Sequence, residues 1–308
     1  MSSGRQRAAV IGLGSMGYGM AQSLMRGQFE VVGCNISPEA VERLKEEGGL
    51  GAASPAEAAE GADVVVCVVV NAEQTEHVLF GPGGAAVTMR PGAVFMSAAT
   101  MDPESSRSLA ARLEATGRYY LDAPISGGPA KAASGQMTIM ASGTPQAFKA
   151  SDAALNAMAG TIYRLGDAAG PASAFKMINQ LLAGVHIAVA SEAMAFAAQQ
   201  GLDLAKVYEV ITGSAGNSWM FENRMPHVVS GDYHPLSAIE IFVKDLGIVQ
   251  DMSRAARFPT PLAGAALQMY LAAAGAGMGK DADASVARVY ANMAGVTLPF
   301  TNATRKKK

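Results

Sequence analysis

The chain has 308 residues, half of them apolar and 16% of them charged. At roughly 150 residues per domain this length predicts two domains, and the composition excludes a largely disordered chain. Lys and Arg together number 24 against 26 Asp and Glu, which gives a formal net charge of −2. That balance excludes the strongly basic surface typical of nucleic-acid-binding proteins. Cys34 and Cys67 are too few for a disulfide framework and predict buried thiols in a reducing compartment.

The sequence predicts a cytoplasmic protein without a membrane segment. The apolar run after the basic N-terminus, residues 8–13, is too short for the core of a signal peptide. The longest uncharged apolar stretch, residues 177–191, includes polar side chains and is shorter than a bilayer-spanning helix needs. We therefore expect neither membrane nor nucleic acid among the partners.

The first half of the chain alternates strand-like and helix-like segments. The expected strands are residues 8–13, 30–34, 63–70, 93–97 and 119–123. The third of these is apolar at every position from Val64 to Val70, so both of its faces must be covered, as in a parallel sheet flanked by helices. Repeated alternation with short connections predicts a Rossmann-type, doubly wound α/β fold.

Four helices between these strands are expected to begin with a capping side chain followed by proline. The pairs are Ser37-Pro38, Ser54-Pro55, Asp102-Pro103 and Thr144-Pro145. In each pair the side-chain oxygen can accept a first-turn N–H, and proline suits the first helical position. Ser54 with Glu57 also fits the capping-box pattern.

After residue 166 the strand-like runs stop, and helical patterns rich in Ala, Met and Leu continue to about Ala294. Pro171 is well placed to begin a long helix. We therefore predict a dinucleotide-binding domain over residues 1–166. An all-α domain for substrate binding and dimerisation is expected over residues 167–308, joined to it by that long helix.

The first strand runs into the glycine-rich turn Gly12-Leu13-Gly14-Ser15-Met16-Gly17, and a helical segment follows. The first glycine allows a tight turn, the second lets a pyrophosphate approach the backbone, and the third lets helix and strand pack closely. The phosphates would lie against free N–H groups at the positive end of the helix dipole. These six residues are predicted to bind a dinucleotide; the alternative is a purely structural turn.

Asn35 follows the second strand, where the side chain typically contacts the adenosine ribose. An acid at this position binds the 2′-hydroxyl, whereas a nearby Arg accommodates a 2′-phosphate. Asn35 can hydrogen-bond a hydroxyl, and no Arg is adjacent. The pattern favours NAD as the cofactor without excluding NADP.

Lys176 is the only charged residue between Asp167 and Glu192, in a helix that is expected to be largely covered. A lone ammonium there costs free energy unless it is paired, lines a wet cleft or gives up its proton. Asn179 and Gln180 follow at i+3 and i+4, on the same helix face, and can grip an oxygen-rich substrate. The alternative is a lysine whose charged end reaches solvent at the domain edge.

A second candidate segment is Asp122-Ala123-Pro124-Ile125-Ser126-Gly127-Gly128, which follows a predicted strand. Its Ser-Gly-Gly turn offers a hydroxyl and accessible N–H groups that suit a carboxylate, although an ordinary turn is an equal alternative. The segment lacks the GxSxG context, and no His and acid arrangement would activate Ser126 as a nucleophile.

Taken together, four motifs resemble the β-hydroxyacid dehydrogenase family, which includes 3-hydroxyisobutyrate dehydrogenase and tartronate semialdehyde reductase. They are the glycine-rich turn, the Ser126 segment, the Lys176 helix and Phe242-Val243-Lys244-Asp245-Leu246. The resemblance covers essentially the whole chain. Within the family, residues 179–186 and 214–224 are most similar to the branch that oxidises the 2-hydroxyl of L-threonate, a four-carbon sugar acid, with NAD.

The resemblance implies roles for individual residues. Lys176 would be catalytic, and the substrate would be bound by Ser126, Gly127, Gly128, Asn179 and Gln180. Further cofactor contacts would come from Val70, Asn71, Gln74, Thr100, Lys244 and Asp245. Two positions depart from the family pattern: many relatives have Asn where this chain has Gln180, and an acid often stands at Asn35. Trp219, Asn223 and Arg224 are further pocket candidates, with core packing for Trp219 and a surface ion pair for Arg224 as alternatives.

The expected reaction is hydride transfer from the hydroxyl-bearing carbon to the nicotinamide, with Lys176 removing the hydroxyl proton. L-threonate is the expected substrate and 2-oxo-tetronate (2-dehydro-L-erythronate) the product. The alternatives are 3-hydroxyisobutyrate, tartronate semialdehyde or glyoxylate as substrate, and a non-catalytic dinucleotide-binding module. No metal is expected, because His77, His186, His227 and His234 lack ligand-type spacing. A homodimer or homotetramer is expected.

Overall fold

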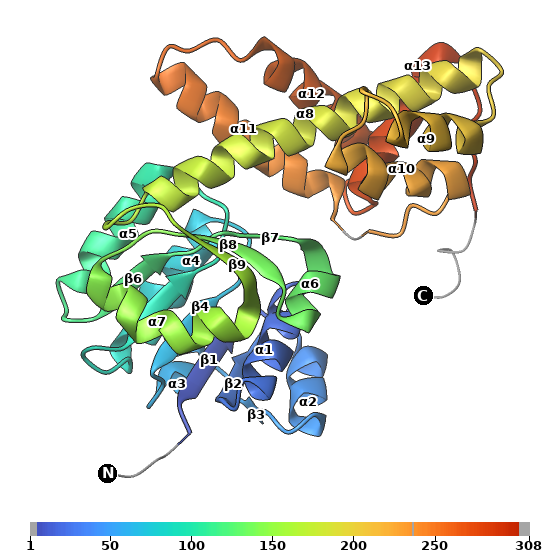
Figure 1. Cartoon of the computed structure of the whole chain (residues 1–308). Helices are drawn as coiled ribbons and strands as arrows, with labels where there is room; N and C mark the ends of the chain where they lie inside the picture. Colours follow the sequence, from blue (N-terminus) through green and yellow to red (C-terminus); the bar gives the residue numbers. More distant parts are fainter. Residues whose placement is uncertain (1–4, 236, 302–308) are drawn as a thin grey trace. The chain divides into compact units, whose positions relative to one another are not determined.

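The computed structural model describes residues 5–235 and 237–301 (Figure 1). The chain divides into two compact units, Met1–Lys176 and Met177–Lys308. A single long helix, α8 (Pro171–Gln199), belongs to both units. The division after residue 166 that the sequence suggests therefore stays a prediction.

In the described residues of the first unit, a parallel sheet has the strand order β3-β2-β1-β4-β5-β6. The strands are β1 (Arg7–Ile11), β2 (Glu30–Cys34), β3 (Leu50–Gly51), β4 (Val64–Cys67), β5 (Val94–Ser97) and β6 (Tyr119–Asp122). The order reverses between β1 and β4, which is the topological switch point of a doubly wound sheet. The predicted Rossmann-type fold is confirmed.

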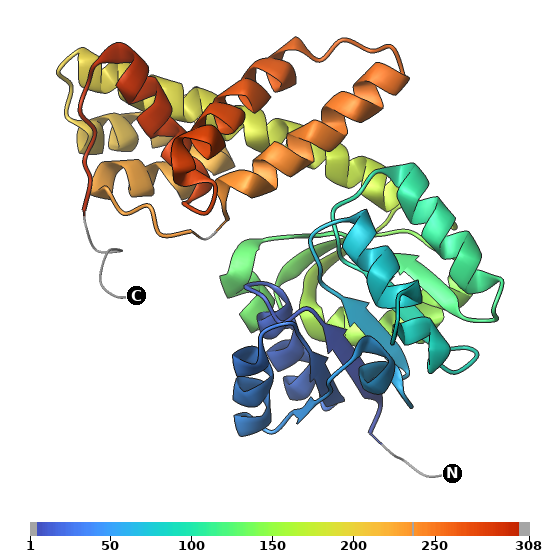
Figure 2. The same ribbon diagram turned by 180° about the vertical axis from the view of Figure 1, so that it is seen from behind.

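Helices cover both faces of this sheet (Figures 1 and 2). The described helices of this unit before α8 are α1 (Gly17–Arg26), α2 (Pro38–Glu46), α3 (Pro55–Ala59), α4 (Ala72–Phe80), the short η1 (Ala85–Val87), α5 (Pro103–Glu114), α6 (Gly128–Ser134) and α7 (Pro145–Met158). Val64 and Val66 of β4 pack into one apolar cluster, and Val65 and Cys67 pack into another. Every residue of this strand is buried because each sheet face has its own helical layer.

The strand expected over residues 63–70 ends at Cys67. Its neighbour β1 ends at Ile11, the register partner of Cys67, because the chain turns away at Gly12. Residues beyond Cys67 therefore have no strand partner on that side, and Val70 is exposed although it is apolar. The three valines from Val68 onward lie in the loop at the carboxyl edge of the sheet.

A second sheet of the first unit, which the sequence patterns do not predict, has the strand order β7-β8-β9 in the described residues. Its strands are β7 (Ile125–Ser126), β8 (Met137–Ala141) and β9 (Ala159–Arg164). β7 runs antiparallel to β8, and β9 runs parallel to it. β9 is mostly exposed and lacks a continuous apolar run, and β7 has only two residues, so neither gives a strand signal.

Three of the four predicted helix caps are confirmed. Ser54, Asp102 and Thr144 each accept a hydrogen bond from a first-turn backbone N–H. Ser37 occupies the cap position of α2, but its hydroxyl donates to Glu39 instead of accepting from the backbone.

The regular elements in the described part of the second unit are helices, as predicted for residues after 166. After α8 they are α9 (Leu204–Thr212), α10 (Trp219–Ser230), α11 (Ile239–Ala255), α12 (Pro261–Ala273), the short η2 (Ala274–Met278) and η3 (Asp283–Ser285), and α13 (Val286–Ala294). Two apolar clusters form its core, one centred on Phe242 and Tyr270 and the other on Phe221 and Met225.

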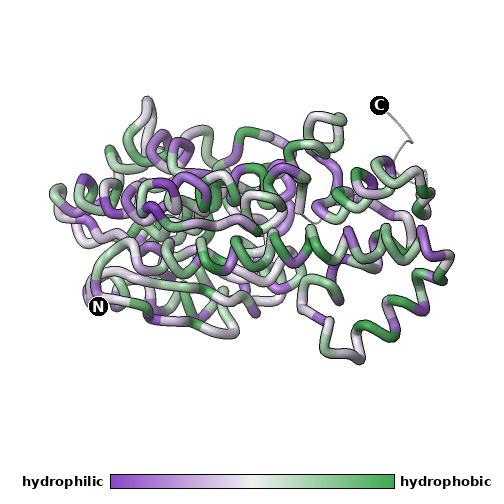
Figure 3. The backbone as a smooth tube through the Cα atoms, turned by 90° about the horizontal axis from the view of Figure 1, so that it is seen from above, coloured by the Kyte–Doolittle hydropathy of each residue, from purple (hydrophilic) through white to green (hydrophobic). Residues whose placement is uncertain are grey.

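Helix α8 has 29 residues and is longer than the apolar stretch 177–191 considered above. Its sequence is rich in Ala and in larger apolar residues, and Figure 3 colours the chain by hydropathy. By length and composition it could cross a membrane, but core helices of soluble proteins have the same composition, and half of its most apolar window is buried. Most residues of this helix are buried or half-buried, as expected, although apolar side chains such as Ile178, Val189 and Phe196 are exposed.

Candidate active site

The predicted site residues of the first unit follow the carboxyl ends of its parallel strands. Residues 12–17 follow β1, Asn35 follows β2, residues 70–74 follow β4, and Thr100 follows β5. Parallel strands end at the same edge of a sheet, and ligands bind such sheets outside the carboxyl ends at the switch point. The switch point lies between β1 and β4. These residues therefore gather at the edge where a dinucleotide is expected.

The three glycines of the turn differ in what a side chain would meet. Gly12 has φ +95°, and a Cβ there would lie 2.5 Å from the Val68 carbonyl oxygen. A Cβ on Gly17 would lie 1.8 Å from the Gly12 carbonyl oxygen, whereas a Cβ on Gly14 would meet nothing within 4 Å. The fold itself requires Gly12 and Gly17. Gly14 leaves open space before α1, which fits the pyrophosphate of a dinucleotide.

Asn35 ties the end of β2 to the glycine-rich turn. Its Oδ1 accepts a hydrogen bond from the Leu13 N–H at 2.9 Å, and its Nδ2 lies 3.3 Å from the Ser37 carbonyl oxygen. This structural contact was not foreseen from the sequence, because it joins residues 22 positions apart. Asn35 therefore helps to shape the turn.

The loop after β4 is held by two local hydrogen bonds. Gln74 Oε1 accepts from the Val70 N–H at 2.9 Å, and Asn71 Oδ1 accepts from the Gln74 N–H at 2.9 Å. Asn71 is thereby the N-cap of α4. Thr100 is half-buried in the loop between β5 and α5. These contacts fix the shape of the loop after β4, which is the neighbour of the strand that leads into the glycine-rich turn.

The Ser-Gly-Gly segment begins in the second sheet. Ser126 pairs with Thr138 across β7 and β8. Gly127 and Gly128 have φ values of +137° and +81°, a conformation that favours glycine, and they lead directly into α6. All three predicted residues are half-buried.

Lys176 reaches this same segment. Its Nζ donates a hydrogen bond to the Ile125 carbonyl oxygen at 2.9 Å, and the residue is only 7% exposed. The two segments are 51 positions apart in the chain, so only the fold brings them together. The structure thus places the predicted base beside the residue that precedes Ser126.

Asp122 is a polar residue of the site region whose importance the sequence motif alone did not reveal. It closes β6, is 1% exposed, and accepts hydrogen bonds from the Gly170 N–H, the Ser173 N–H and the Ser173 hydroxyl. Burial raises the pKa of the Asp122 carboxyl, and these hydrogen bonds oppose the rise. An acid at the buried end of a strand is the signal that could have marked it.

The predicted residues of the second unit form one cluster between α8 and α11. Gln180 Nε2 donates to the Asp245 carboxylate, and Asn179 Nδ2 donates to Gln180 Oε1 at 2.9 Å. Lys244 Nζ lies 2.6 Å from Asp245 Oδ1. Asp245 is 1% exposed. The structure therefore brings these four residues together. Lys244 and Asp245 form an ion pair, and the side-chain amides of Gln180 and Asn179 are joined to it by hydrogen bonds.

The alternative considered for Trp219 is wrong, and the one for Arg224 is right about an ion pair but wrong about its exposure. Trp219 is 55% exposed, so it is not a core residue. Arg224 Nε lies 2.8 and 3.0 Å from the two oxygens of Asp283, which is 1% exposed, so this ion pair is buried. Burial raises the pKa of the Asp283 carboxyl, and the Arg224 charge opposes the rise. Asn223 contributes its Oδ1 as an acceptor for Arg224.

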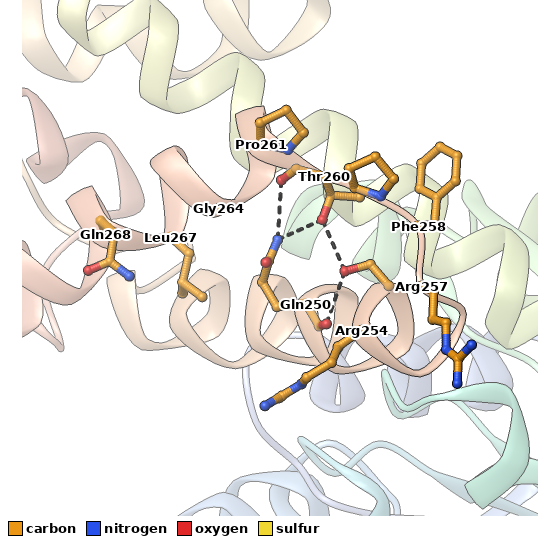
Figure 4. A pocket seen from close by; sticks show the side chains of 11 residues that line it. Gln250, Arg254, Arg257, Phe258, Thr260, Pro261, Gly264, Leu267 and Gln268 are labelled. Carbon is orange, nitrogen blue, oxygen red and sulfur yellow. Dashed lines mark hydrogen bonds between the residues drawn. The ribbon is translucent and has the colours of Figure 1, made fainter.

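An open hollow of about 800 Å³ lies between α11 and α12 (Figure 4). Gln250 crosses it and donates to Thr260 Oγ1 at 2.9 Å. Among the described residues that line it, none is a predicted site residue. The described residues also contain no group of three His, Cys, Asp or Glu that could hold a metal ion.

Comparison with known proteins gives matches along almost the whole chain. A family profile for the NAD-binding domain of 6-phosphogluconate dehydrogenase matches residues 7–166, and one described as NAD-binding of NADP-dependent 3-hydroxyisobutyrate dehydrogenase matches residues 170–290. L-threonate dehydrogenase from Cupriavidus necator is 52% identical over 94% of this chain and 97% of its own length. The same enzyme from Escherichia coli (strain K12) is 47% identical over 94% and 95%. A crystal structure of 3-hydroxyisobutyrate dehydrogenase from Salmonella typhimurium is 49% identical, with a TM-score of 0.88 over 92% of this chain and 99% of that one.

Proposed function

This chain belongs to the 3-hydroxyisobutyrate dehydrogenase family of NAD(P)-binding oxidoreductases, and from that premise we propose that it oxidises L-threonate to 2-dehydro-L-erythronate with NAD. As a member of this family it is a dehydrogenase that acts on the hydroxyl group of a small hydroxyacid. The observation that carries the substrate proposal is the 52% identity to an L-threonate dehydrogenase over nearly the full length of both chains.

In the proposed reaction Lys176 is the general base. Its amine takes the proton of the substrate hydroxyl during oxidation, and its ammonium returns that proton in the reverse direction. The bound nicotinamide supplies the hydride acceptor. The hydrogen bond from Lys176 to the Ile125 carbonyl supports this role, because it holds the base at the segment proposed to bind the substrate.

We assign the substrate carboxylate to the Ser126 hydroxyl and the N–H groups of Gly127 and Gly128. The positive φ values of both residues favour glycine, and a glycine has no side chain to keep a ligand away from its backbone N–H, which supports this assignment. Asn179 and Gln180, about one turn after Lys176 on α8, are assigned to the hydroxyl groups of the sugar acid. Their amide groups can both donate and accept hydrogen bonds.

The dinucleotide is assigned to the carboxyl edge of the parallel sheet. Residues 12–17 would hold the pyrophosphate, and the open space at Gly14 supports that position. The remaining proposed cofactor contacts are Asn35, Val70, Asn71, Gln74, Thr100, Lys244 and Asp245. Lys244 and Asp245 are assigned from the family motif, and their ion pair keeps the lysine in a defined position.

NAD is proposed over NADP because the segment after β2 offers no free cation for a 2′-phosphate. From Asn35 onward the first basic residue is Arg43, and its guanidinium stacks 4.4 Å above the Tyr18 ring. The variant Ile36→Arg adds a cation at a fully exposed position and should raise kcat/KM with NADP at least tenfold, with Ile36→Gln as control. A wild-type preference for NADP would contradict this part of the proposal.

The substrate is tested by following NADH formation with purified protein and a panel of hydroxyacids. L-threonate should give the highest kcat/KM, D-threonate is the stereochemical control, and tartronate semialdehyde and glyoxylate are tested in the reverse direction with NADH. A higher kcat/KM for 3-hydroxyisobutyrate would replace the proposed substrate. That second candidate is favoured by the 49% identical Salmonella structure, which carries the name 3-hydroxyisobutyrate dehydrogenase.

A homo-oligomer is proposed because α8 presents exposed apolar side chains along one helix face. Ile178, Leu182, Val189 and Phe196 are each between 49% and 61% exposed, at spacings of four or seven residues. Val189→Asp should dissociate the oligomer in light-scattering measurements. Val210→Asp on α9, where the valine is equally exposed, is the matched control. A monomeric wild type, or dissociation by both variants alike, would overturn the assignment of this face.

A cytoplasmic location is proposed from the cysteines. Cys34 and Cys67 are both free and buried, as expected in a reducing compartment. Cell fractionation with the native protein tests this, and recovery in a membrane or extracellular fraction would contradict it.

A further inference from the structure

We infer that Asp122 is a positioning residue for Lys176: from the end of β6 it caps helix α8 and so sets where the lysine ammonium lies. The inference rests on the proposed role of Lys176 as the base. Both residues belong to the first unit of the chain. Asp122 itself touches none of the reacting atoms in this assignment.

The first argument is the complete satisfaction of the donors at the start of α8. An α-helix begins with four N–H groups that have no partner inside the helix. Gly170 N–H and Ser173 N–H donate to Asp122 Oδ2 at 3.0 and 2.9 Å, and Ala172 N–H donates to Ser142 Oγ at 3.0 Å. Pro171 has no N–H. The side chain at the end of β6 and the side chain directly after β8 therefore supply the entire cap of this helix.

The second argument is that α8 cannot be capped by its own chain. The residue before Pro171 is Gly170, which has φ +113°. A Cβ there would lie 2.7 Å from the Arg107 side chain. A Ser, Thr, Asp or Asn at this position would be strained and crowded, so the capping acceptor has to come from elsewhere in the fold. Asp122 is buried beside the start of α8, so water cannot take the place of this side chain as the acceptor for the first-turn N–H groups.

The third argument connects the cap to Lys176. Asp122 accepts hydrogen bonds from the N–H of Ser173 and, at 2.8 Å, from the Ser173 hydroxyl. Ile125 follows Asp122 by three residues, and its carbonyl oxygen accepts the hydrogen bond from Lys176. Ser173 and Lys176 are also three residues apart, hence on the same face of α8. Two points of contact therefore hold residues 122–125 against residues 173–176. A shift of the first contact moves the lysine relative to Ser126.

The expected effect follows from the sensitivity of proton transfer to geometry. A misplacement of about 1 Å at a reacting group can lower the rate about 100-fold. Asp122→Ala should therefore lower kcat by about 10- to 100-fold and leave the Kd for NADH within about twofold of wild type. Asp122→Asn should restore kcat to within about threefold, because its amide oxygen can still accept from both backbone N–H groups.

The matched control is Asp63→Ala. Asp63 also accepts a backbone hydrogen bond, from the Arg7 N–H at 2.8 Å. It lies directly before β4, at the amino ends of the parallel strands, whereas the proposed site lies at their carboxyl ends. This variant should lose stability and keep its kcat. Equal losses of kcat in Asp63→Ala and Asp122→Ala would mean that Asp122 acts only through global stability, and would overturn the inference. So would an Asp122→Asn variant as inactive as Asp122→Ala.

A readout that does not depend on turnover separates this inference from the proposed function. The rate of Lys176 acetylation by acetic anhydride, measured by peptide mass spectrometry, should rise several-fold in Asp122→Ala. The wild-type lysine is only 7% exposed, and loss of the cap should free its amine to reach the reagent. If the wild type oxidises no hydroxyacid, the proposed function fails, and faster acetylation still supports the cap. An unchanged acetylation rate overturns the cap.

Ser142→Ala provides a milder variant if Asp122→Ala does not fold. It removes only the acceptor for the Ala172 N–H. A several-fold lower kcat with faster Lys176 acetylation supports the inference. Wild-type values for both quantities overturn it.

Discussion

Lys176 Nζ and the Ile125 carbonyl oxygen are 2.9 Å apart, and the lysine donates a hydrogen bond to that oxygen. The carbonyl belongs to the residue directly before Ser126, and the two segments lie 51 positions apart in the chain. This bond puts the proposed base and the proposed carboxylate-binding turn in one place. It also gives the buried ammonium a partner, which a charge so little exposed requires.

Replacing the proposed base should strongly slow turnover and leave cofactor binding intact. Lys176→Ala should lower kcat by about 10²–10⁴-fold, the usual contribution of a general base. NADH fluorescence titration should give a Kd close to that of wild type. The exposed Lys149→Ala on α7 is the control and should keep full activity. If Lys176→Ala retained wild-type kcat, another residue would have to be the base.

Two glycines of the same turn should respond differently to the same substitution. Gly17→Ala places a Cβ 1.8 Å from the Gly12 carbonyl oxygen and should destabilise the fold by about 1–3 kcal/mol or more. Gly14→Ala meets no protein atom within 4 Å, so it should fold normally but bind NAD at least tenfold more weakly. Thermal unfolding with and without NAD measures both quantities. Undiminished NAD binding by Gly14→Ala would contradict the proposed pyrophosphate position.

The buried ion pair of the second unit should contribute far more to stability than an exposed one. Arg224→Ala leaves the Asp283 carboxylate buried without its cation, which should cost about 3–5 kcal/mol in the free energy of unfolding. Arg254→Ala breaks a pair with Asp251 whose side chains are more than 70% exposed, and should cost less than about 1 kcal/mol. Urea unfolding of the two variants is the comparison. Similar losses would show that burial does not set the strength of these pairs.

The buried Asp122 carboxyl should make stability depend on pH. Burial raises its pKa, so the folded protein holds this proton more tightly than the unfolded chain does. The stability that this group contributes is complete below its ordinary pKa of about 3.9 and is lost as pH rises through the raised value. The difference in unfolding free energy between wild type and Asp122→Asn should therefore fall as pH rises from about 4 to 7. Urea unfolding across that range checks the slope, and a constant or rising difference would contradict it.

The features predicted correctly from the sequence are those with a local cause. Val64 to Cys67 is apolar at every position because both sheet faces are covered, so the run identifies a parallel strand by itself. The same pattern does not predict where the strand ends, because Val68 to Val70 are equally apolar. The strand ends where its neighbour turns away at Gly12, which is a property of the partner and not of the run.

For the candidate site, too, local signals were predictable from the sequence and long-range contacts were not. Lys176 was recognisable as the only charge on an apolar helix, and the glycines of residues 12–17 were recognisable by their spacing. Asp122 was overlooked as a functional residue because its partners, Gly170 and Ser173, lie 48 and 51 positions away. The contact of Asn35 with Leu13 was missed for the same reason.

By itself, therefore, the sequence determined the alternating strands and helices of the parallel sheet, the helical second half of the chain, the candidate phosphate-binding turn and the candidate base. Hydrophobic periodicity, glycine spacing and an isolated charge are all read within a few neighbouring residues. Only the tertiary structure decided that Asp122 caps α8, that Gln180 binds Asp245 and that Arg224 pairs with Asp283. Each of these contacts joins a buried polar group to a partner at least 48 positions away, because a donor or acceptor removed from water must be satisfied by whichever side chain the fold brings within reach.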